Sequence, residues 1–142
     1  MAPNGPRTTD HGLLIIITMQ ARARRRYIRS SPRKMRIVAD VVRGKRVVEA
    51  LRTLHFMPQR SARPIELTIQ SAVANLIDQN QDEKVDDAAL VVAEIRVDEA
   101  PFFKRHRPVS RGRAHPILKR SSHLTVVVGV PGTNGEPQSD ED

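Results

Sequence analysis

The 142-residue chain contains no cysteine and no tryptophan, and it has only one tyrosine and three phenylalanines. The absence of cysteine excludes a disulfide framework, a zinc site built on thiolates and thiol chemistry. The shortage of aromatic side chains argues against modules that recognise single-stranded bases by stacking them on exposed rings. Contacts with phosphate groups and with nucleic-acid shape are left as the expected mode of any nucleic-acid binding.

Long hydrophobic runs and catalytic patterns are also missing. The apolar patch from Leu13 to Ile17 is too short for the core of a signal peptide or for a membrane span. The five histidines show no metal-binding spacing, and the lone Gly44 in RGKR does not match a phosphate-binding loop. We therefore expect no catalytic residue, no metal, no cofactor, no membrane association and no homo-oligomer.

Positive charge is abundant and unevenly distributed. The chain has 24 Lys and Arg against 16 Asp and Glu, a net charge of +8, which favours a polyanionic partner. Basic and acidic residues number 14 and 2 in 19–64, 2 and 9 in 65–100, and 7 and 0 in 101–123. This order predicts that two basic segments share a partner-facing side while the acidic middle faces solvent. The many arginines favour bidentate contacts with phosphate.

The segment 97–128, VDEAPFFKRHRPVSRGRAHPILKRSSHLTVVV, carries the most information. Apolar residues alternate on both sides of its basic centre, at Val91, Ala93, Ile95 and Val97 before it and at Leu124, Val126, Val128 and Val130 after it. This pattern predicts a long β-hairpin at about 98–124 that turns near Arg111 and Gly112. Thirteen residues in each arm would reach roughly 40 Å, and such a hairpin needs a partner to order it.

Helical signals precede the hairpin. The segment 20–29 favours a strand with Ala21, Ala23, Arg25 and Tyr27 on one face. Ser31 and Pro32 then predict the start of a helix over 33–43, whose apolar face would be Met35, Val38, Ala39 and Val42 and which would end at Gly44. A second, short helix fits Val47 to Leu54.

The third helix has the clearest pattern. Ser61 is a candidate cap, and Ile65, Ile69, Ala72, Val73 and Leu76 recur on one face up to about Asn80. An acidic loop, QDEKVDD, follows at 81–87, and a strand begins near Ala88. The order predicts an α+β fold with three helices packed on a small antiparallel sheet and a long protruding β-hairpin.

The chain divides into three parts. We expect residues 1–18 to be a disordered or mis-annotated extension, with Met19 as a possible true start; the alternative is a short arm that packs Leu13 to Ile17 on a neighbour. We expect residues 19–130 to form a single RNA-binding domain that includes the hairpin. We expect residues 131–142, rich in proline, glycine and acid, to form a disordered tail.

Three stretches carry a resemblance to a known family: SSPRKMRIVADVVRGKRVVEAL from Ser30, SAVANLIDQN from Ser71, and the hairpin segment from Val97. They resemble the bacterial type of large-subunit ribosomal protein family twenty-two. The resemblance implies a cytoplasmic structural constituent of the large ribosomal subunit that clamps several ribosomal RNA domains during assembly. Its hairpin would line the nascent-peptide exit tunnel, so its partners would be ribosomal RNA, neighbouring ribosomal proteins and the nascent peptide.

The resemblance also assigns residues to the tunnel end of the hairpin, namely Phe103, Lys104, Arg105, Arg111, Gly112, Arg113 and Ala114. From the charge pattern, the candidate RNA-binding residues are Arg22, Arg24, Arg25, Arg26, Arg29, Arg33, Lys34, Arg36, Arg43, Lys45, Arg46, Lys104, Arg105, Arg107, Arg111, Arg113, Lys119 and Arg120. Two alternatives stay open on the residues alone: a free-standing basic architectural protein that binds DNA, and a nuclease or RNA-modifying enzyme.

Overall fold

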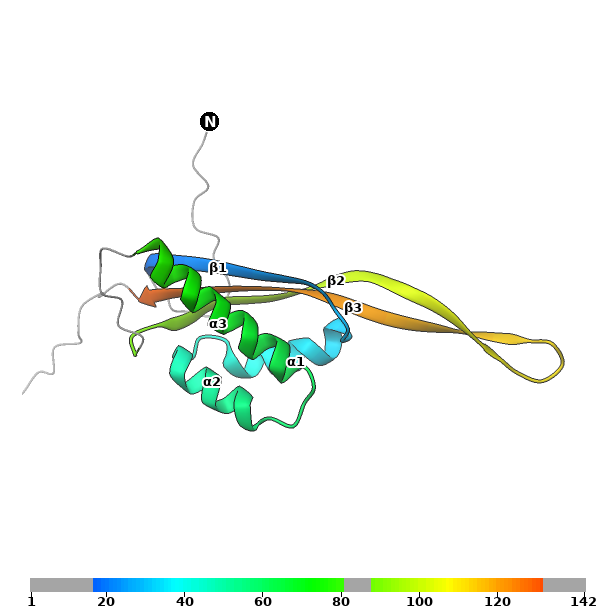
Figure 1. Ribbon diagram of the computed structural model, residues 1–142. Coiled ribbons are helices and arrows are strands. Elements are labelled where there is room, and N and C mark those ends of the chain that lie inside the picture. The colour runs from blue at the N-terminus through cyan, green and yellow to red at the C-terminus, as the bar shows by residue number, and fades with distance from the viewer. Residues whose placement is uncertain (1–16, 81–87, 132–142) are drawn as a thin grey trace, which may run out of the picture.

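The computed structural model describes residues 17–80 and 88–131. Its elements in chain order are β1 (Ile17–Ile28), α1 (Pro32–Val42), α2 (Val47–Phe56), α3 (Ala62–Gln79), β2 (Val91–Pro108) and β3 (Ala114–Pro131). The strands form one antiparallel sheet in the order β1-β3-β2, and beyond the helices β2 and β3 continue as a long hairpin (Figure 1). The α+β fold predicted from the sequence is confirmed.

The core lies between the sheet and the helices. Leu124, Val126 and Val128 of the central strand β3 are fully buried, as are Ile65, Ile69, Ala72 and Leu76 of α3. These are the residues that the periods of two and of 3.6 place on the buried faces of a strand and a helix. Helix α3 lies against β1 and β3, whereas α1 lies against β2.

Helix α1 and the loop after it protect the free edge of β2. The guanidinium of Arg36 donates hydrogen bonds to the carbonyl oxygen of Val97 at 3.2 and 3.3 Å, and Arg43 donates to that of Ile95 at 3.2 Å. Gly44 N–H donates to the Val92 carbonyl, and Val92 N–H donates to the Lys45 carbonyl. An exposed strand edge invites pairing with other chains, and these contacts occupy it.

The helix ends follow the sequence signals only in part. Ser31 and Ser61 precede α1 and α3, yet neither side chain caps its helix. Instead, the Ser61 hydroxyl hydrogen-bonds the Ser30 hydroxyl at 2.9 Å, which joins the start of α3 to the end of β1. Gly44 has φ +74, as a residue after a helix C-terminus often does. Helix α2 extends to Phe56, two residues beyond the predicted end.

The predicted buried faces of β1 and β2 are wrong in detail because both strands contain irregularities. Ala21 and Ala23 are buried, but the register shifts between Arg25 and Ile28, so that Ile28 turns inward and Tyr27 is exposed at φ +54. A second shift between Val92 and Glu94 buries Val92 and leaves Ala93 only partly covered. A bulge inverts the alternation on which the prediction depended.

Acidic residues of the middle segment do not all face solvent, contrary to expectation. Glu66 is 7% exposed, and its carboxylate lies 2.9 Å from Arg63 and 3.7 Å from His55. Asp98, at the root of the hairpin, lies 3.5 Å from the Arg96 guanidinium. Part of the acidic charge is therefore paired within the domain.

Several predictions concern segments outside the described residues: the N-terminal extension as far as residue 16, the acidic loop at 81–87 and the tail from residue 132. Strand β1 begins at Ile17, two residues before the boundary expected at Met19, and Ile17 pairs with Pro131. Among the described residues, no helix is long and apolar enough to cross a membrane.

Candidate nucleic-acid interface

The first basic surface lies on β1, one of the two edge strands of the sheet. Arg22, Arg24, Arg25 and Arg26 are all exposed. Three consecutive exposed arginines are possible because the register shift after Arg25 breaks the alternation of faces. An edge strand with this charge resists pairing with a second sheet and presents four guanidinium groups to a polyanion.

The second basic surface is the hairpin. Every residue from 101 to 120 is exposed except Val109, which is partly buried. Register assigns the side chains to two faces, because residues directly opposite each other share a face. Phe103, Arg105 and Arg107 lie opposite Lys119, Ile117 and His115 on one face, and Lys104, His106 and Pro108 lie opposite Leu118, Pro116 and Ala114 on the other. The first face carries three of the four basic residues in these pairs.

The turn of the hairpin is tight. Arg111 and Gly112 have φ of +61 and +67, and the backbone N–H of Arg113 donates to the Ser110 carbonyl at 3.5 Å. Two central residues with positive φ match the right-handed twist of the flanking strands. The turn predicted near Arg111 and Gly112 is confirmed, and it displays Arg111 and Arg113 at the far end of the hairpin.

The seven residues assigned to the tunnel end fall into two groups. Arg111, Gly112, Arg113 and Ala114 lie at the turn, whereas Phe103, Lys104 and Arg105 lie on the shaft opposite Lys119, Leu118 and Ile117. On the shaft, the Phe103 ring has the guanidinium carbon of Arg29 at 5.3 Å from its centroid and that of Arg105 at 5.7 Å. These cation–π contacts join the end of β1 to the base of the hairpin.

Three of the predicted RNA-binding arginines also hold the fold together. Arg36 and Arg43 bind carbonyl groups of β2, and Arg43 lies 2.8 Å from the Asp40 carboxylate. Arg29 lies 3.5 Å from both the Lys119 carbonyl and the Ser121 hydroxyl. Lys45 is 3.5 Å from Glu49. Seven other exposed candidates of the globular part have side chains with no such structural contact among the described residues, namely Arg22, Arg24, Arg25, Arg26, Arg33, Lys34 and Arg46.

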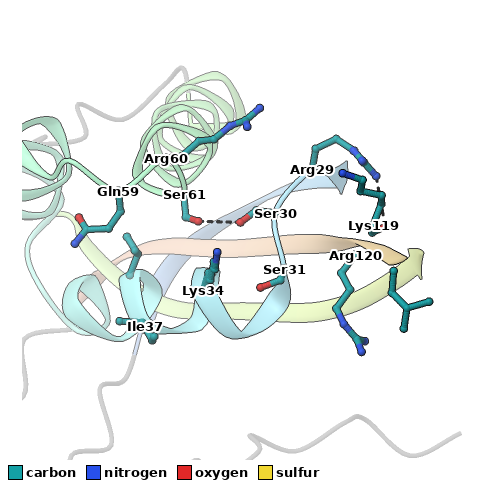
Figure 2. Close-up of a pocket in the computed structure, with 12 residues that line it drawn as sticks. Arg29, Ser30, Ser31, Lys34, Ile37, Gln59, Arg60, Ser61, Lys119 and Arg120 are labelled. Atoms are coloured by element: carbon teal, nitrogen blue, oxygen red, sulfur yellow. Dashed lines mark hydrogen bonds between the residues drawn. The ribbon is translucent and has the colours of Figure 1, made fainter. Parts of the chain in front are cut away.

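The structure adds a site that the sequence analysis missed. A hollow of about 700 Å³ opens between the start of α1, the loop before α3 and the root of the hairpin (Figure 2). Five basic residues line it, namely Arg29, Lys34, Arg60, Lys119 and Arg120. Arg60 was not a candidate before, since no sequence pattern links the loop at 59–61 to residues near 30 and 120. No group of acidic and histidine side chains that could hold a metal occurs among the described residues.

Comparison with known proteins agrees with these features. The family model described as "Ribosomal protein L22p/L17e" matches residues 23–129. A "Large ribosomal subunit protein uL22" of Salinibacter ruber is 56% identical over 112 residues, which cover 79% of this chain and 92% of that protein. Proteins of the same name from Desulfitobacterium hafniense strain Y51 and Herpetosiphon aurantiacus are 50% and 51% identical, over 77% and 78% of this chain and 93% and 95% of those proteins. The chain therefore belongs to the ribosomal protein family L22p/L17e, which is a family of ribosomal proteins rather than enzymes.

Proposed function

We propose that the chain is a cytoplasmic structural constituent of the large ribosomal subunit that binds large-subunit ribosomal RNA. The relatives named as large-subunit proteins support this role over that of a free-standing DNA-binding protein. The charge supports it as well, since a net +8 with exposed arginines on β1 and on the hairpin suits a polyanion.

The observation that carries the proposal is the exposed hairpin. Residues 101–108 and 114–120 are paired with each other but not covered by the rest of the domain. A two-stranded hairpin is only marginally stable in water on its own, so the contacts that order it must come from a partner. Its seven basic residues and absence of acid between 101 and 123 specify a partner with dense negative charge.

The two basic surfaces are far enough apart to contact different RNA segments. Arg25 of β1 pairs with Leu124 of β3. Arg113, at the tip of the hairpin, lies eleven residues before Leu124 in the chain. At about 3.3 Å per residue this separation is about 36 Å. A single rigid sheet that binds RNA at both points would hold two RNA domains at a fixed distance, which is how the chain would clamp them during assembly.

The hairpin would line the nascent-peptide exit tunnel, with Arg111, Gly112, Arg113 and Ala114 at the tunnel end and Phe103, Lys104 and Arg105 along the shaft. The exposed tip and its tight turn support this placement, because a narrow two-stranded element can enter RNA where a folded domain cannot. The globular domain would remain at the subunit surface beside neighbouring ribosomal proteins.

Two measurements test this function. Quantitative mass spectrometry across a sucrose gradient of cell lysate should find the chain in stoichiometric amounts with the large subunit. Ribosomes that carry a photo-crosslinking amino acid at Arg111 and a stalled nascent chain should give a crosslink between the two. A chain that sediments with DNA or at the top of the gradient would contradict the ribosomal role. Crosslinks from position 111 to RNA alone would contradict the tunnel placement.

A further inference from the structure

The hollow beside α1 is lined by both basic and apolar side chains, and a site for phosphate alone would need only the basic ones. Arg29, Lys34, Arg60, Lys119 and Arg120 supply positive charge, and no acidic residue is among the lining residues. Ile37, Val38 and Leu118 supply an apolar wall, and Ile37 and Leu118 are 63% and 41% exposed. Gln59 and three serines complete the lining (Figure 2).

We propose that this hollow binds one nucleotide of the ribosomal RNA, turned out of its base stack. The inference rests on the proposed RNA-binding function and adds a specific pocket to it. The base would lie against Ile37, at the end of the hollow that also holds Gln59, and the flanking phosphates would contact Lys34, Arg60 and Arg120. Proteins commonly recognise RNA through unstacked bases that they cover with side chains and bind along their polar edges.

Size and chemistry favour a nucleotide over a bare phosphate. A volume of about 700 Å³ exceeds what one phosphate group fills and lies within the roughly 300–1,000 Å³ typical of small-ligand sites. A phosphate alone would leave the apolar wall in water. Gln59 adds a carbonyl and an amide group, which can accept and donate hydrogen bonds to the edge of a base.

The hollow is formed before any ligand binds. The hydrogen bond of 2.9 Å between the Ser30 and Ser61 hydroxyls fixes the loop before α3 against the end of β1. Contacts of Arg29 with the Lys119 carbonyl and with the Phe103 ring fix the hairpin root against the same segment. A site that needs little ordering on binding loses less entropy, so a single extruded nucleotide can contribute measurably to affinity.

The affinity test compares four variants of the full chain by binding to large-subunit ribosomal RNA of the organism that encodes it. Ile37→Ser should weaken binding about fivefold to tenfold, the lower part of the effect found for removing a base-stacking side chain. Arg60→Gln should weaken it similarly and lower the log-log salt slope by about 0.7 to 0.9. Val41→Ser is the matched control, because Val41 lies one turn further along α1 and outside the hollow. Arg52→Gln, on α2, controls for the loss of charge. Both controls should stay within twofold of the parent.

A photo-crosslinking amino acid at position 37 should crosslink to a single nucleotide, whereas the same group at position 41 should not. The proposal is overturned if Arg60→Gln weakens binding and Ile37→Ser does not, because the hollow then holds backbone phosphate only. Crosslinks to another protein, or crosslinks spread over many nucleotides, would also overturn it. If the parent chain itself does not bind this RNA above background, the result contradicts the proposed RNA-binding function, on which the nucleotide site depends.

Discussion

The backbone N–H of Tyr27 donates a hydrogen bond to Nδ1 of His123 at 3.0 Å, and the two rings meet edge to face with centroids 4.7 Å apart. This pair holds the irregular end of β1, where Tyr27 has φ +54, against the central strand β3. Since Nδ1 accepts the hydrogen bond, the proton of the neutral imidazole lies on Nε2. His123 therefore stabilises the point at which β1 leaves the sheet and the chain turns toward α1.

Replacing His123 by Ala should lower the free energy of unfolding by about 0.5–1.5 kcal/mol, because the bulge loses its hydrogen-bond acceptor and its ring contact. Urea unfolding of the isolated chain measures this. His115→Ala is the control, since His115 is exposed on the hairpin and should change stability little. Equal losses for both variants would mean that the Tyr27 contact contributes nothing to the fold.

Leu76→Ala should destabilise the domain by about 2–5 kcal/mol, because Leu76 is fully buried in α3 and its removal leaves a cavity. Its neighbour Ile77 is 46% exposed, so Ile77→Ala should stay within about 0.5 kcal/mol of the parent. Thermal melting of the two variants is a direct check on which face of α3 is buried. A larger loss of stability for Ile77→Ala than for Leu76→Ala would mean that the opposite face of α3 is buried.

Arg36→Ala should have two effects, because Arg36 occupies the edge carbonyl of Val97. Stability should fall by about 1 kcal/mol for the lost hydrogen bonds, and the uncovered edge of β2 should promote self-association. Denaturant unfolding measures the first effect and sedimentation velocity the second. Arg33→Ala removes an exposed charge from the same helix and serves as the control. Identical behaviour of the two variants would exclude a role in edge protection.

Arg111→Ala with Arg113→Ala should weaken binding to ribosomal RNA and leave the melting temperature of the free chain unchanged, because both side chains are exposed at the hairpin tip. If each contacts one phosphate, the log-log salt slope should fall by about 1.4 to 1.8. Melting and filter binding on the same samples separate the two quantities. A parallel loss of melting temperature would refute the view that the tip serves only binding.

The two faces of the hairpin should differ in RNA binding. The double variant Arg105→Ala with Arg107→Ala removes two charges from the face that also carries Lys119. Lys104→Ala removes the single Lys or Arg among the paired residues of the opposite face. We expect the double variant to lower the salt slope by about 1.4 to 1.8 and Lys104→Ala to lower it by less than half of that. Hydroxyl-radical footprints should lose protection at different nucleotides for the two. Identical footprints would mean that the hairpin binds RNA without a preferred face.

Periodicity and turn chemistry were enough to predict the elements, the buried face of α3 and the turn at Arg111 and Gly112, because these depend on neighbours close in sequence. The face of β1 at Tyr27 could not be predicted, since a bulge is decided by the strand it pairs with. Ser61 fits the pattern of a helix cap, but its hydroxyl binds Ser30 instead. Whether a serine hydroxyl binds its own helix or a residue distant in sequence depends on the tertiary structure.

The candidate site divides in the same way. The basic content of β1 and the hairpin is visible in the sequence, but Arg36 and Arg43 proved to bind strand carbonyls, which charge counting cannot detect. The hollow depends on three segments, near residues 30, 60 and 120, that meet only through the packing of α1, α3 and β3. Arg60 therefore became a candidate only once these segments were seen together.

The central position of β3 also determines when the domain can fold during its synthesis. Ala21 pairs with Val128, and Ala23 pairs with Val126, so β1 has no partner until almost all of the described chain has been made. Contacts between such distant residues form slowly, because a long loop must close before they stabilise anything. Four arginines on β1 give the strand a positive charge, which opposes its pairing with other chains before β3 has been made. The order of the strands thus makes completion of the sheet a late event in folding.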